Sequence, residues 1–203
     1  MADLQRIQRL RKFVLALGAT TYFALATVST TIPLLPETVH EALEAVGVIL
    51  IALAVGGRAW CTLYIGGRKK VALVQSGPYS VMRNPLYSFT FLGVLGIGLQ
   101  FGGLSFALIG LVIAWSVFTF VVQQEERFLE ERYHAEYKAY LERVPRFLPK
   151  FSEWSDLDVL EVQPRLVLRT VLDASLMLLA LPYFEIVEYL QQIGFLSVLL
   201  ILY

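Results

Sequence analysis

The chain has 203 residues, of which 57% are hydrophobic, and its mean hydropathy is +0.62. A soluble domain is usually about 45–50% apolar, so this composition indicates a membrane protein with one helical domain. Lys and Arg together number 17, as do Asp and Glu, and this balance does not indicate a nucleic-acid partner. The single cysteine cannot form an internal disulfide, and no cluster of Cys and His residues indicates a metal site.

The N-terminal half contains two apolar segments that predict membrane helices. Residues 13–35 are close in length to the roughly 20 residues that a bilayer core requires. Residues 45–55 are short for a span, unless their helix starts in the preceding loop and reaches Arg58. The N-terminus is basic, as in a secretory signal, but Pro-Leu-Leu-Pro follows the first apolar segment where a cleavage site would need small residues. We therefore expect the first helix to be retained.

The placement of charge predicts the orientation of the chain in the membrane. The loop at residues 37–44 is acidic and has no Lys or Arg, whereas residues 58–83 carry five cations and no acid. The positive-inside rule puts residues 58–83 and the basic N-terminus in the cytoplasm and the acidic loop outside. We expect a protein of the bacterial inner membrane, or its equivalent, with a cytoplasmic N-terminus.

Two further apolar segments, residues 86–99 and 104–122, predict a transmembrane hairpin with both ends in the cytoplasm. Small residues in the hairpin would let helices approach closely; they are Gly93, Gly96, Gly98 and Gly110. Residues 123–143 then predict an amphipathic cytoplasmic helix, because aromatic and Leu residues recur at helical spacing. Pro145 would end this helix.

The C-terminal part predicts an extended strap, an acidic linker and more apolar helix. The strap covers residues 144–149 and the linker residues 152–163. Residues 166–182 and 186–203 are apolar but contain charges, so they form either one further span or two interfacial or re-entrant helices. The predicted fold is therefore an all-α polytopic membrane protein with four or five transmembrane helices and a cytoplasmic amphipathic helix.

A short polar segment, residues 77–87, lies between apolar segments and contains two prolines. Each proline fixes its own φ and biases the preceding residue away from helix, while Gly77 can adopt backbone angles closed to other residues. We therefore expect a rigid turn at the start of a membrane helix. This turn presents Tyr79, Arg83, Asn84 and Tyr87.

Polar side chains lie at both cytoplasmic ends of the predicted hairpin. Arg83, Asn84 and Tyr87 are at its start, and Glu125 and Glu126 are at its end. Because the ends of a hairpin are neighbours, these groups should converge on a pocket at the membrane edge, where ionisable groups are costly unless paired or used. Either Glu126 pairs with Arg83 and fastens the hairpin, or the cluster holds a small zwitterionic or cationic ligand.

Four sequence blocks occur in order between residues 58 and 150. They are Leu-Val-x-x-Gly-Pro-Tyr with Arg-Asn-Pro-Leu-Tyr at residues 73–87, Glu-Glu-x-x-Leu at 125–129, Glu-Tyr-x-x-Tyr at 136–140, and Val-Pro-Arg-Phe-Leu-Pro at 144–149. This pattern resembles the isoprenylcysteine carboxyl methyltransferase family, which with the related phospholipid N-methyltransferases comprises integral-membrane enzymes that use S-adenosylmethionine. Two departures occur: Asn84 stands where the family usually has His, and Tyr133-His134 stands where it has Phe-Gly.

The resemblance implies a methyltransferase that acts on a lipidic or amphiphilic acceptor at the cytoplasmic membrane edge, beside membrane lipid. The resemblance covers a methyltransferase core at residues 58–150, and we expect two further parts outside it: a two-helix membrane segment at 1–57, and an acidic linker with C-terminal apolar helices at 151–203. The residues implied in binding S-adenosylmethionine are Leu73, Val74, Gly77, Tyr79, Asn84, Tyr87, Glu125 and Glu126. Tyr79 or Tyr87 would lie on the adenine or near the sulfonium, and Glu126 would pair with the ammonium or the ribose hydroxyls.

The resemblance also assigns catalytic and acceptor-binding candidates. The catalytic candidates are Arg83, Glu126 and Tyr87. Arg83 and Arg146 suit the cofactor carboxylate or an anionic acceptor, because a guanidinium binds such groups in a bidentate fashion. An amine or hydroxyl acceptor would need a base, for which Glu126 or Tyr87 is the candidate. Arg58 either snorkels or faces the pocket and, with Arg146, would bind the acceptor.

The sequence leaves the identity of the acceptor open. A prenylated cysteine carboxylate, a phospholipid amine, a lipid phosphate and a small thiol all suit the pattern. The alternative in another class is a non-enzymatic membrane protein for binding or assembly that retains the fold without the chemistry.

Overall fold

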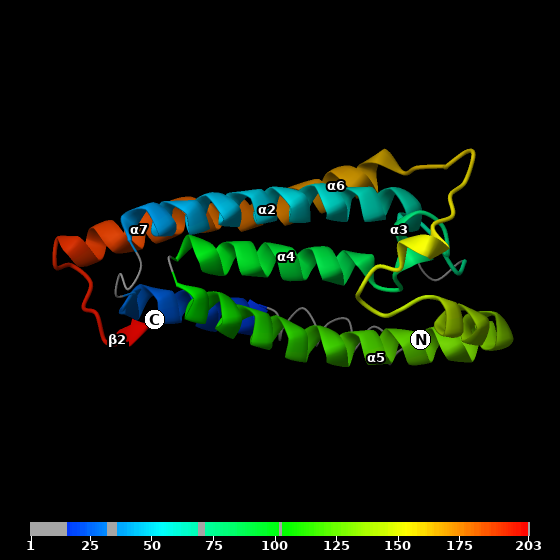
Figure 1. Ribbon diagram of the computed structural model, residues 1–203, viewed down its shortest axis with the longest axis horizontal. Helices are drawn as coiled ribbons and strands as arrows, with labels where there is room; N and C mark the ends of the chain where they lie inside the picture. The colour runs from blue at the N-terminus through cyan, green and yellow to red at the C-terminus, as the bar shows by residue number, and fades with distance from the viewer. Residues whose placement is uncertain (1–15, 32–35, 69–71, 102, 203) are drawn as a thin grey trace. The chain divides into compact units, whose positions relative to one another are not determined.

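The computed structural model describes residues 16–31, 36–68, 72–101 and 103–202. Helices make up nearly all of its regular structure (Figure 1), so the all-α fold class is confirmed. The chain divides into two compact units, which we describe separately. Unit 1 comprises Met1–Ala52, Phe91–Val121 and Leu176–Tyr203, and unit 2 comprises Leu53–Thr90 and Val122–Ser175.

The first described helix is Ala16–Val28. The elements after it are β1 (Ser29–Thr31), α2 (Glu37–Ile65), α3 (Pro78–Val81), α4 (Pro85–Gln100), α5 (Leu104–Arg143), η1 (Phe151–Glu153), α6 (Pro164–Ser175), η2 (Leu176–Leu179), α7 (Ala180–Gln192) and β2 (Leu200–Leu202).

Three helical stretches in the described residues are long and apolar enough to cross a membrane. They are Thr38–Ile65, Leu104–Arg143 and Pro164–Gln192. Ala16–Val28 and Pro85–Gln100 are apolar but shorter. These helices fit a membrane protein by length and composition, while the number of spans and their orientation stay predictions.

Several predicted boundaries differ from those in the structure. The second helix is much longer than residues 45–55, because α2 begins in the acidic loop at Glu37 and continues to Ile65. The first helix ends at Val28, and Ser29–Thr31 forms a strand; the rest of the predicted first span lies outside the described residues. In the C-terminal part, α6, η2 and α7 follow one another over Pro164–Gln192, a stretch long and apolar enough for a single span.

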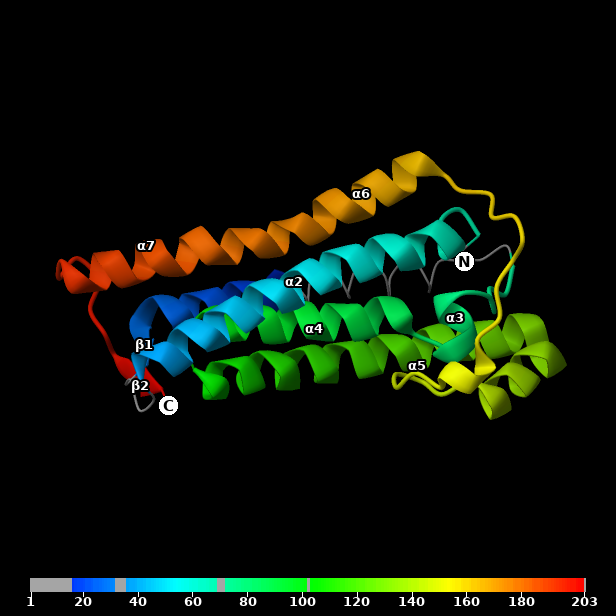
Figure 2. The ribbon, with the colours of Figure 1, turned by 45° about the horizontal axis from the view of Figure 1, so that its top comes forward.

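The prediction of apolar helix up to residue 203 was wrong for Leu200–Leu202. These residues form β2, which pairs in parallel with β1 (Figure 2). The preceding helix ends before Gly194, whose φ of 73° is accessible mainly to glycine. The Leu199 backbone N–H then donates to the Val28 carbonyl at 2.8 Å. The backbone groups of the tail are thus satisfied by the start of the chain instead of by a helix.

Within unit 1, glycines bring helices into close contact, as the sequence predicted. A Cβ atom on Gly96 of α4 would lie 2.6 Å from the Gly47 carbonyl oxygen of α2, and one on Gly47 would lie 2.8 Å from the Gly96 carbonyl oxygen. A Cβ atom on Gly98 would lie 2.2 Å from the Ala107 Cα atom of α5. Larger side chains at these positions would separate the helix backbones.

In unit 2, the end of α5 is bent by a kink that the sequence did not predict. His134 has φ 42° and ψ −113° inside the helix, and the last turns of α5 double back after it (Figure 2). The returning segment buries Tyr137, Tyr140 and Val144 in a cluster with Leu73 and other apolar side chains. The amphipathic helix at residues 123–143 is therefore present but not straight.

The segment at residues 73–81 is irregular at first and then helical. Residues 73–75 have no regular structure, and Pro78–Val81 forms the short helix α3. Proline is favoured at the first position of a helix because its missing N–H needs no partner there. Gly77, which precedes it, has φ 58° and ψ −130°, so the predicted need for glycine at this turn is confirmed.

Candidate functional site

The start of α4 runs beside the strap at residues 144–149, and this pairing builds the site in unit 2. Met82 is extended, with φ −151° and ψ 146°, which leaves the next two backbone N–H groups free to pair outside α3. The Arg83 N–H donates to the Pro145 carbonyl at 2.9 Å, and the Asn84 N–H donates to the Arg146 carbonyl at 3.2 Å. Two of the sequence blocks are thereby joined through their backbones.

Glu126 lies at the centre of an ion cluster between two guanidinium groups. Arg146 binds it in a bidentate fashion, with Nη2 2.5 Å from Oε2 and Nε 3.2 Å from Oε1. Arg83 Nη1 lies 3.4 Å from Oε1. The side chains of Glu126 and Arg83 are only 12% and 14% exposed, and charges this shielded need partners. The predicted pairing of Glu126 with Arg83 is present, and Arg146 adds a second cation.

The adjacent carboxylate, Glu125, has a different partner. The Tyr87 hydroxyl donates to Glu125 Oε2 at 3.1 Å, which joins the start of α4 to the part of α5 in unit 2. The two ends of the predicted hairpin do converge, as expected from the sequence. The cluster of Arg83, Arg146, Glu125 and Glu126 contains two cations and two acids, an arrangement that suits a zwitterionic ligand.

Tyr79 supplies a buried hydroxyl that has no hydrogen-bond partner among the described residues. The residue is only 5% exposed. Burial raises the pKa of Tyr79 well above its usual value, and the electrostatic influence of Cys61, Tyr140, Glu125 and Tyr87 raises it further. The hydroxyl therefore keeps its proton. A buried polar group without a partner costs about 1–3 kcal/mol, so this donor suits a polar atom of a bound ligand.

The residues present fit S-adenosylmethionine by their chemistry. The cofactor has an aromatic base, hydroxyl groups, an ammonium and a carboxylate. The site offers tyrosine rings, carboxylates, guanidinium groups and the unpaired donor of Tyr79. Arg83 Nε is also buried and has no hydrogen-bond partner among the described residues, which adds a second unused donor beside Glu126.

The other predicted site residues surround this cluster or lie apart from it. Asn84 Nδ2 donates to the Arg146 carbonyl at 3.4 Å, so its amide supports the strap. Val74 packs against the buried cluster that contains Tyr79, whereas Leu73 packs in the separate cluster of Tyr137 and Tyr140. Arg58 Nη1 donates to the Thr90 hydroxyl of α4. The roles assigned to these residues stay predictions.

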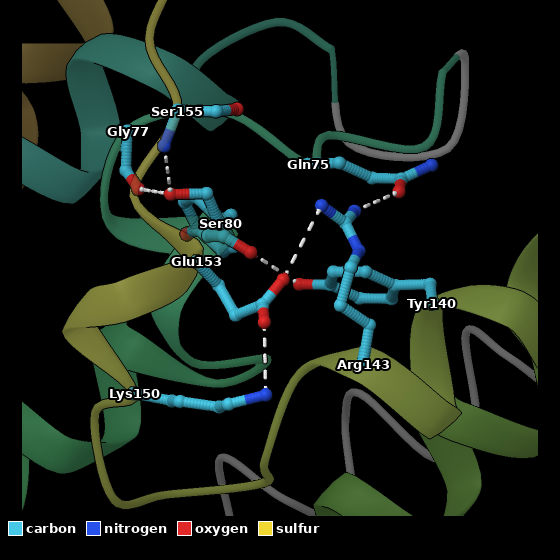
Figure 3. A network of polar contacts seen from close by, with 9 residues as sticks. Gln75, Gly77, Ser80, Tyr140, Arg143, Lys150, Glu153 and Ser155 are labelled. Atoms are coloured by element: carbon cyan, nitrogen blue, oxygen red, sulfur yellow. Dashed lines mark hydrogen bonds and ion pairs between the residues drawn. The ribbon is translucent and has the colours of Figure 1, made fainter.

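A polar network beside the site was missed by sequence reasoning (Figure 3). Gln75 donates to Glu136 at 3.1 Å and accepts from Arg143 at 3.0 Å. Glu153 contacts Lys150 at 2.8 Å and Arg143 at 3.9 Å, and the hydrogen bond from Lys150 is the main reason that the pKa of Glu153 is lowered. In the sequence no motif or periodic pattern links these residues to one another, so their contacts could not be predicted from it.

Tyr140 and Lys150 also form hydrogen bonds with the backbone of α3. The Tyr140 hydroxyl donates to the Tyr79 carbonyl at 2.7 Å, and the Lys150 N–H donates to the Val81 carbonyl at 2.9 Å. Tyr140 was expected only on the apolar face of the amphipathic helix. Its hydroxyl, brought back by the kink at His134, is instead a direct support of α3.

Part of the chain matches a known protein family. Residues 39–136 match the phospholipid methyltransferase family. The match includes Tyr79, Arg83, Tyr87, Glu125 and Glu126 and ends before Arg146. It supports the methyltransferase-like part of the resemblance drawn from the sequence, and no solved structure matches the chain.

Two curated relatives are named as metal resistance proteins. Over 114 residues the chain is 39% identical to the nickel-cobalt-cadmium resistance protein NccN of Alcaligenes xylosoxydans xylosoxydans. This alignment covers 56% of this chain and 53% of the relative. Over 115 residues it is 40% identical to the cobalt-zinc-cadmium resistance protein CzcN of Cupriavidus metallidurans, with coverage of 56% and 52%. The chain thus matches about half the length of these relatives. Within its described residues, no group of three or more His, Cys, Asp or Glu side chains is placed to hold a metal ion.

Proposed function

We propose that this protein is an S-adenosylmethionine-dependent methyltransferase of the isoprenylcysteine carboxyl methyltransferase type. Its acceptor is a lipidic or amphiphilic molecule that reaches the site from the membrane. The observation that carries the proposal is the unpaired, buried Tyr79 hydroxyl, which is under the electrostatic influence of Glu125 and Tyr87, in a segment that matches a methyltransferase family. The charge distribution of the sequence supports a cytoplasmic position for this site, by the positive-inside rule.

Each side chain of the cluster has a task in this proposal. Bound S-adenosylmethionine would supply a methyl group activated by its sulfonium. Glu126 accepts hydrogen bonds from the ammonium or ribose hydroxyls, and Arg83 or Arg146 binds the carboxylate. Tyr79 donates to a polar atom of the ligand, and Tyr87, whose hydroxyl donates to Glu125, would contact the ligand through its ring.

Methyl transfer from a sulfonium is a displacement that depends on alignment of the acceptor more than on acid–base chemistry. The chain therefore needs rigid positioning, and the ion cluster with the paired backbones of residues 83–84 and 145–146 provides it. An anionic acceptor would be attracted by Arg146, whose side chain is 38% exposed and is the more accessible of the two guanidinium groups that contact Glu126. An amine or hydroxyl acceptor would need Glu126 or Tyr87 as its base.

The second candidate is a membrane protein for binding or assembly that has kept the fold without the chemistry. The relatives named for metal resistance favour this alternative. Under it, the Arg83–Glu126–Arg146 cluster only fastens α4, α5 and the strap together.

Calorimetric titration with S-adenosylhomocysteine separates the two functions. We expect saturable micromolar binding by the detergent-purified wild type and a loss of at least tenfold in affinity for Glu126→Gln, which removes the charge but keeps the size. Glu130→Gln is the matched control, because Glu130 is exposed one turn further along α5 and should bind like the wild type. A folded wild type that does not bind would contradict the methyltransferase proposal and favour the alternative.

A further inference from the structure

Residues beyond both the family match and the resembling blocks contact the turn that leads into α3. Trp154 stacks on Trp60 of α2 with ring centroids 5.8 Å apart and an interplanar angle of 24°. The two residues after it, Ser155 and Asp156, belong to a stretch that the sequence presented only as an acidic linker. Ser155 is hydrogen-bonded to the segment that carries Gly77 and Tyr79, whereas Asp156 is hydrogen-bonded to Tyr64 of α2.

Both backbone polar groups of Ser155 form hydrogen bonds with the turn, and Figure 3 shows the bond from its N–H to Ser80. Its carbonyl accepts from the Gly77 N–H at 2.8 Å, and its N–H donates to the Ser80 hydroxyl at 3.0 Å. Ser80 is fully buried and donates in turn to the Gly77 carbonyl at 2.7 Å. The buried Ser80 hydroxyl is thereby satisfied as donor and acceptor, and Ser155 makes two hydrogen bonds to the Gly77–Ser80 turn.

Asp156 acts on the same turn through Tyr64. The Tyr64 hydroxyl lies 3.0 and 2.9 Å from the two carboxylate oxygens of Asp156, to which it donates its proton. The ring of Tyr64 lies directly against Gly77, because a Cβ atom there would be 2.3 Å from two of its carbons. Gly77 is thus held on one side by the ring of Tyr64 and on the other by the carbonyl of Ser155.

We propose that Ser155 and Asp156 are positioning residues for the cofactor site: they lock the Gly77–Ser80 turn and so hold Tyr79 in its place. This inference rests on the proposed function, since it assigns the purpose of the lock to cofactor binding. Tyr79 is two residues beyond Gly77, and its unpaired hydroxyl is useful to a ligand only at a fixed position. A donor that moves would lose the advantage of a preorganised site.

The test compares variants of Asp156 by affinity for S-adenosylhomocysteine and by hydrogen exchange of the Gly77 amide. Asp156→Ala should weaken affinity about threefold to tenfold, as expected for one hydrogen bond, and should speed exchange of that amide. Asp156→Asn keeps an oxygen acceptor for Tyr64, so its affinity for S-adenosylhomocysteine and its Gly77 amide exchange rate should be close to those of the wild type. Tyr64→Phe should reproduce the effect of Asp156→Ala, since it removes the other half of the same contact.

The matched control is Thr170→Val. It removes the hydrogen bond at 3.1 Å between Thr62 of α2 and Thr170 of α6, a contact of the same helix with the C-terminal part but away from Gly77. It should change neither affinity nor exchange. Wild-type affinity in a folded Asp156→Ala protein would overturn the positioning role. A different result would be faster exchange of the Gly77 amide in Asp156→Ala together with a wild-type protein that does not bind S-adenosylhomocysteine. That result would overturn the proposed function and, with it, the role of the Gly77–Ser80 turn in cofactor binding.

Discussion

His134 adopts a backbone conformation that its side chain does not favour. Its φ of 42° with ψ of −113° lies in a region populated mainly by glycine, and such residues cost about 1–3 kcal/mol. The resembling family usually has glycine at the matching position, which this geometry explains. The strain at the kink is offset because the segment after it buries Tyr137 and Tyr140. The same segment lets the Tyr140 hydroxyl donate to the Tyr79 backbone carbonyl.

Replacing His134 by Gly should therefore stabilise the protein. We expect an increase of about 1 kcal/mol or more in the free energy of unfolding, because glycine relieves the strain at positive φ. The measurement is thermal or denaturant unfolding in detergent. Ala135→Gly is the control: Ala135 is exposed and helical, so this change should destabilise by about 0.5–1 kcal/mol. A loss of stability in His134→Gly would show that the side chain makes a contribution larger than the strain.

At the scale of single residues, sequence reasoning found the charges of the site but not all their partners. The spacing of Arg83, Tyr87, Glu125 and Glu126 at the ends of two apolar segments was sufficient to predict that they meet. The contacts of Gln75, Ser155 and Asp156 were not predictable, because each depends on where an irregular segment crosses the fold. Irregular backbone carries no periodic signal of the kind that identifies helices.

The helices of unit 1 depend on glycine at their contact points. Gly96→Ala should destabilise by about 1–3 kcal/mol, as overpacking usually does, because the new methyl group would lie 2.6 Å from the Gly47 carbonyl oxygen. Gly56→Ala is the matched control within α2, since a Cβ atom there meets nothing within 4 Å. It should be neutral or stabilise by up to about 1 kcal/mol.

Melting of the two glycine variants in the same detergent provides the measurement. Equal effects of Gly96→Ala and Gly56→Ala would contradict a close approach of α2 and α4.

At the scale of helices and strands, the sequence predicted the apolar helices and the small residues between them well, since both have a composition signal. It did not predict the kink in α5 or the pairing of β1 with β2, which are set by contacts between distant segments.

At the scale of the whole molecule, the proposed orientation gives a prediction that the single cysteine makes easy to check. Cys61 is fully buried, so the wild type should react little with a membrane-impermeant maleimide. In spheroplasts, Glu41→Cys should be labelled from outside, whereas Lys138→Cys should be labelled only after the membrane is opened. Both positions are exposed. The reverse labelling pattern would put the candidate site on the wrong side for a cytoplasmic cofactor.

The central claim is that the cluster around Tyr79 binds S-adenosylmethionine. The most direct measurement is the affinity for S-adenosylhomocysteine of wild type and Tyr79→Phe, with melting of both proteins in parallel. Removing a buried hydroxyl that lacks a partner should leave stability unchanged or higher, while affinity should fall about threefold to tenfold if the hydroxyl donates to the ligand. This opposite response of stability and affinity is the predicted result. Unchanged affinity in Tyr79→Phe, or no binding by the folded wild type, would contradict the account.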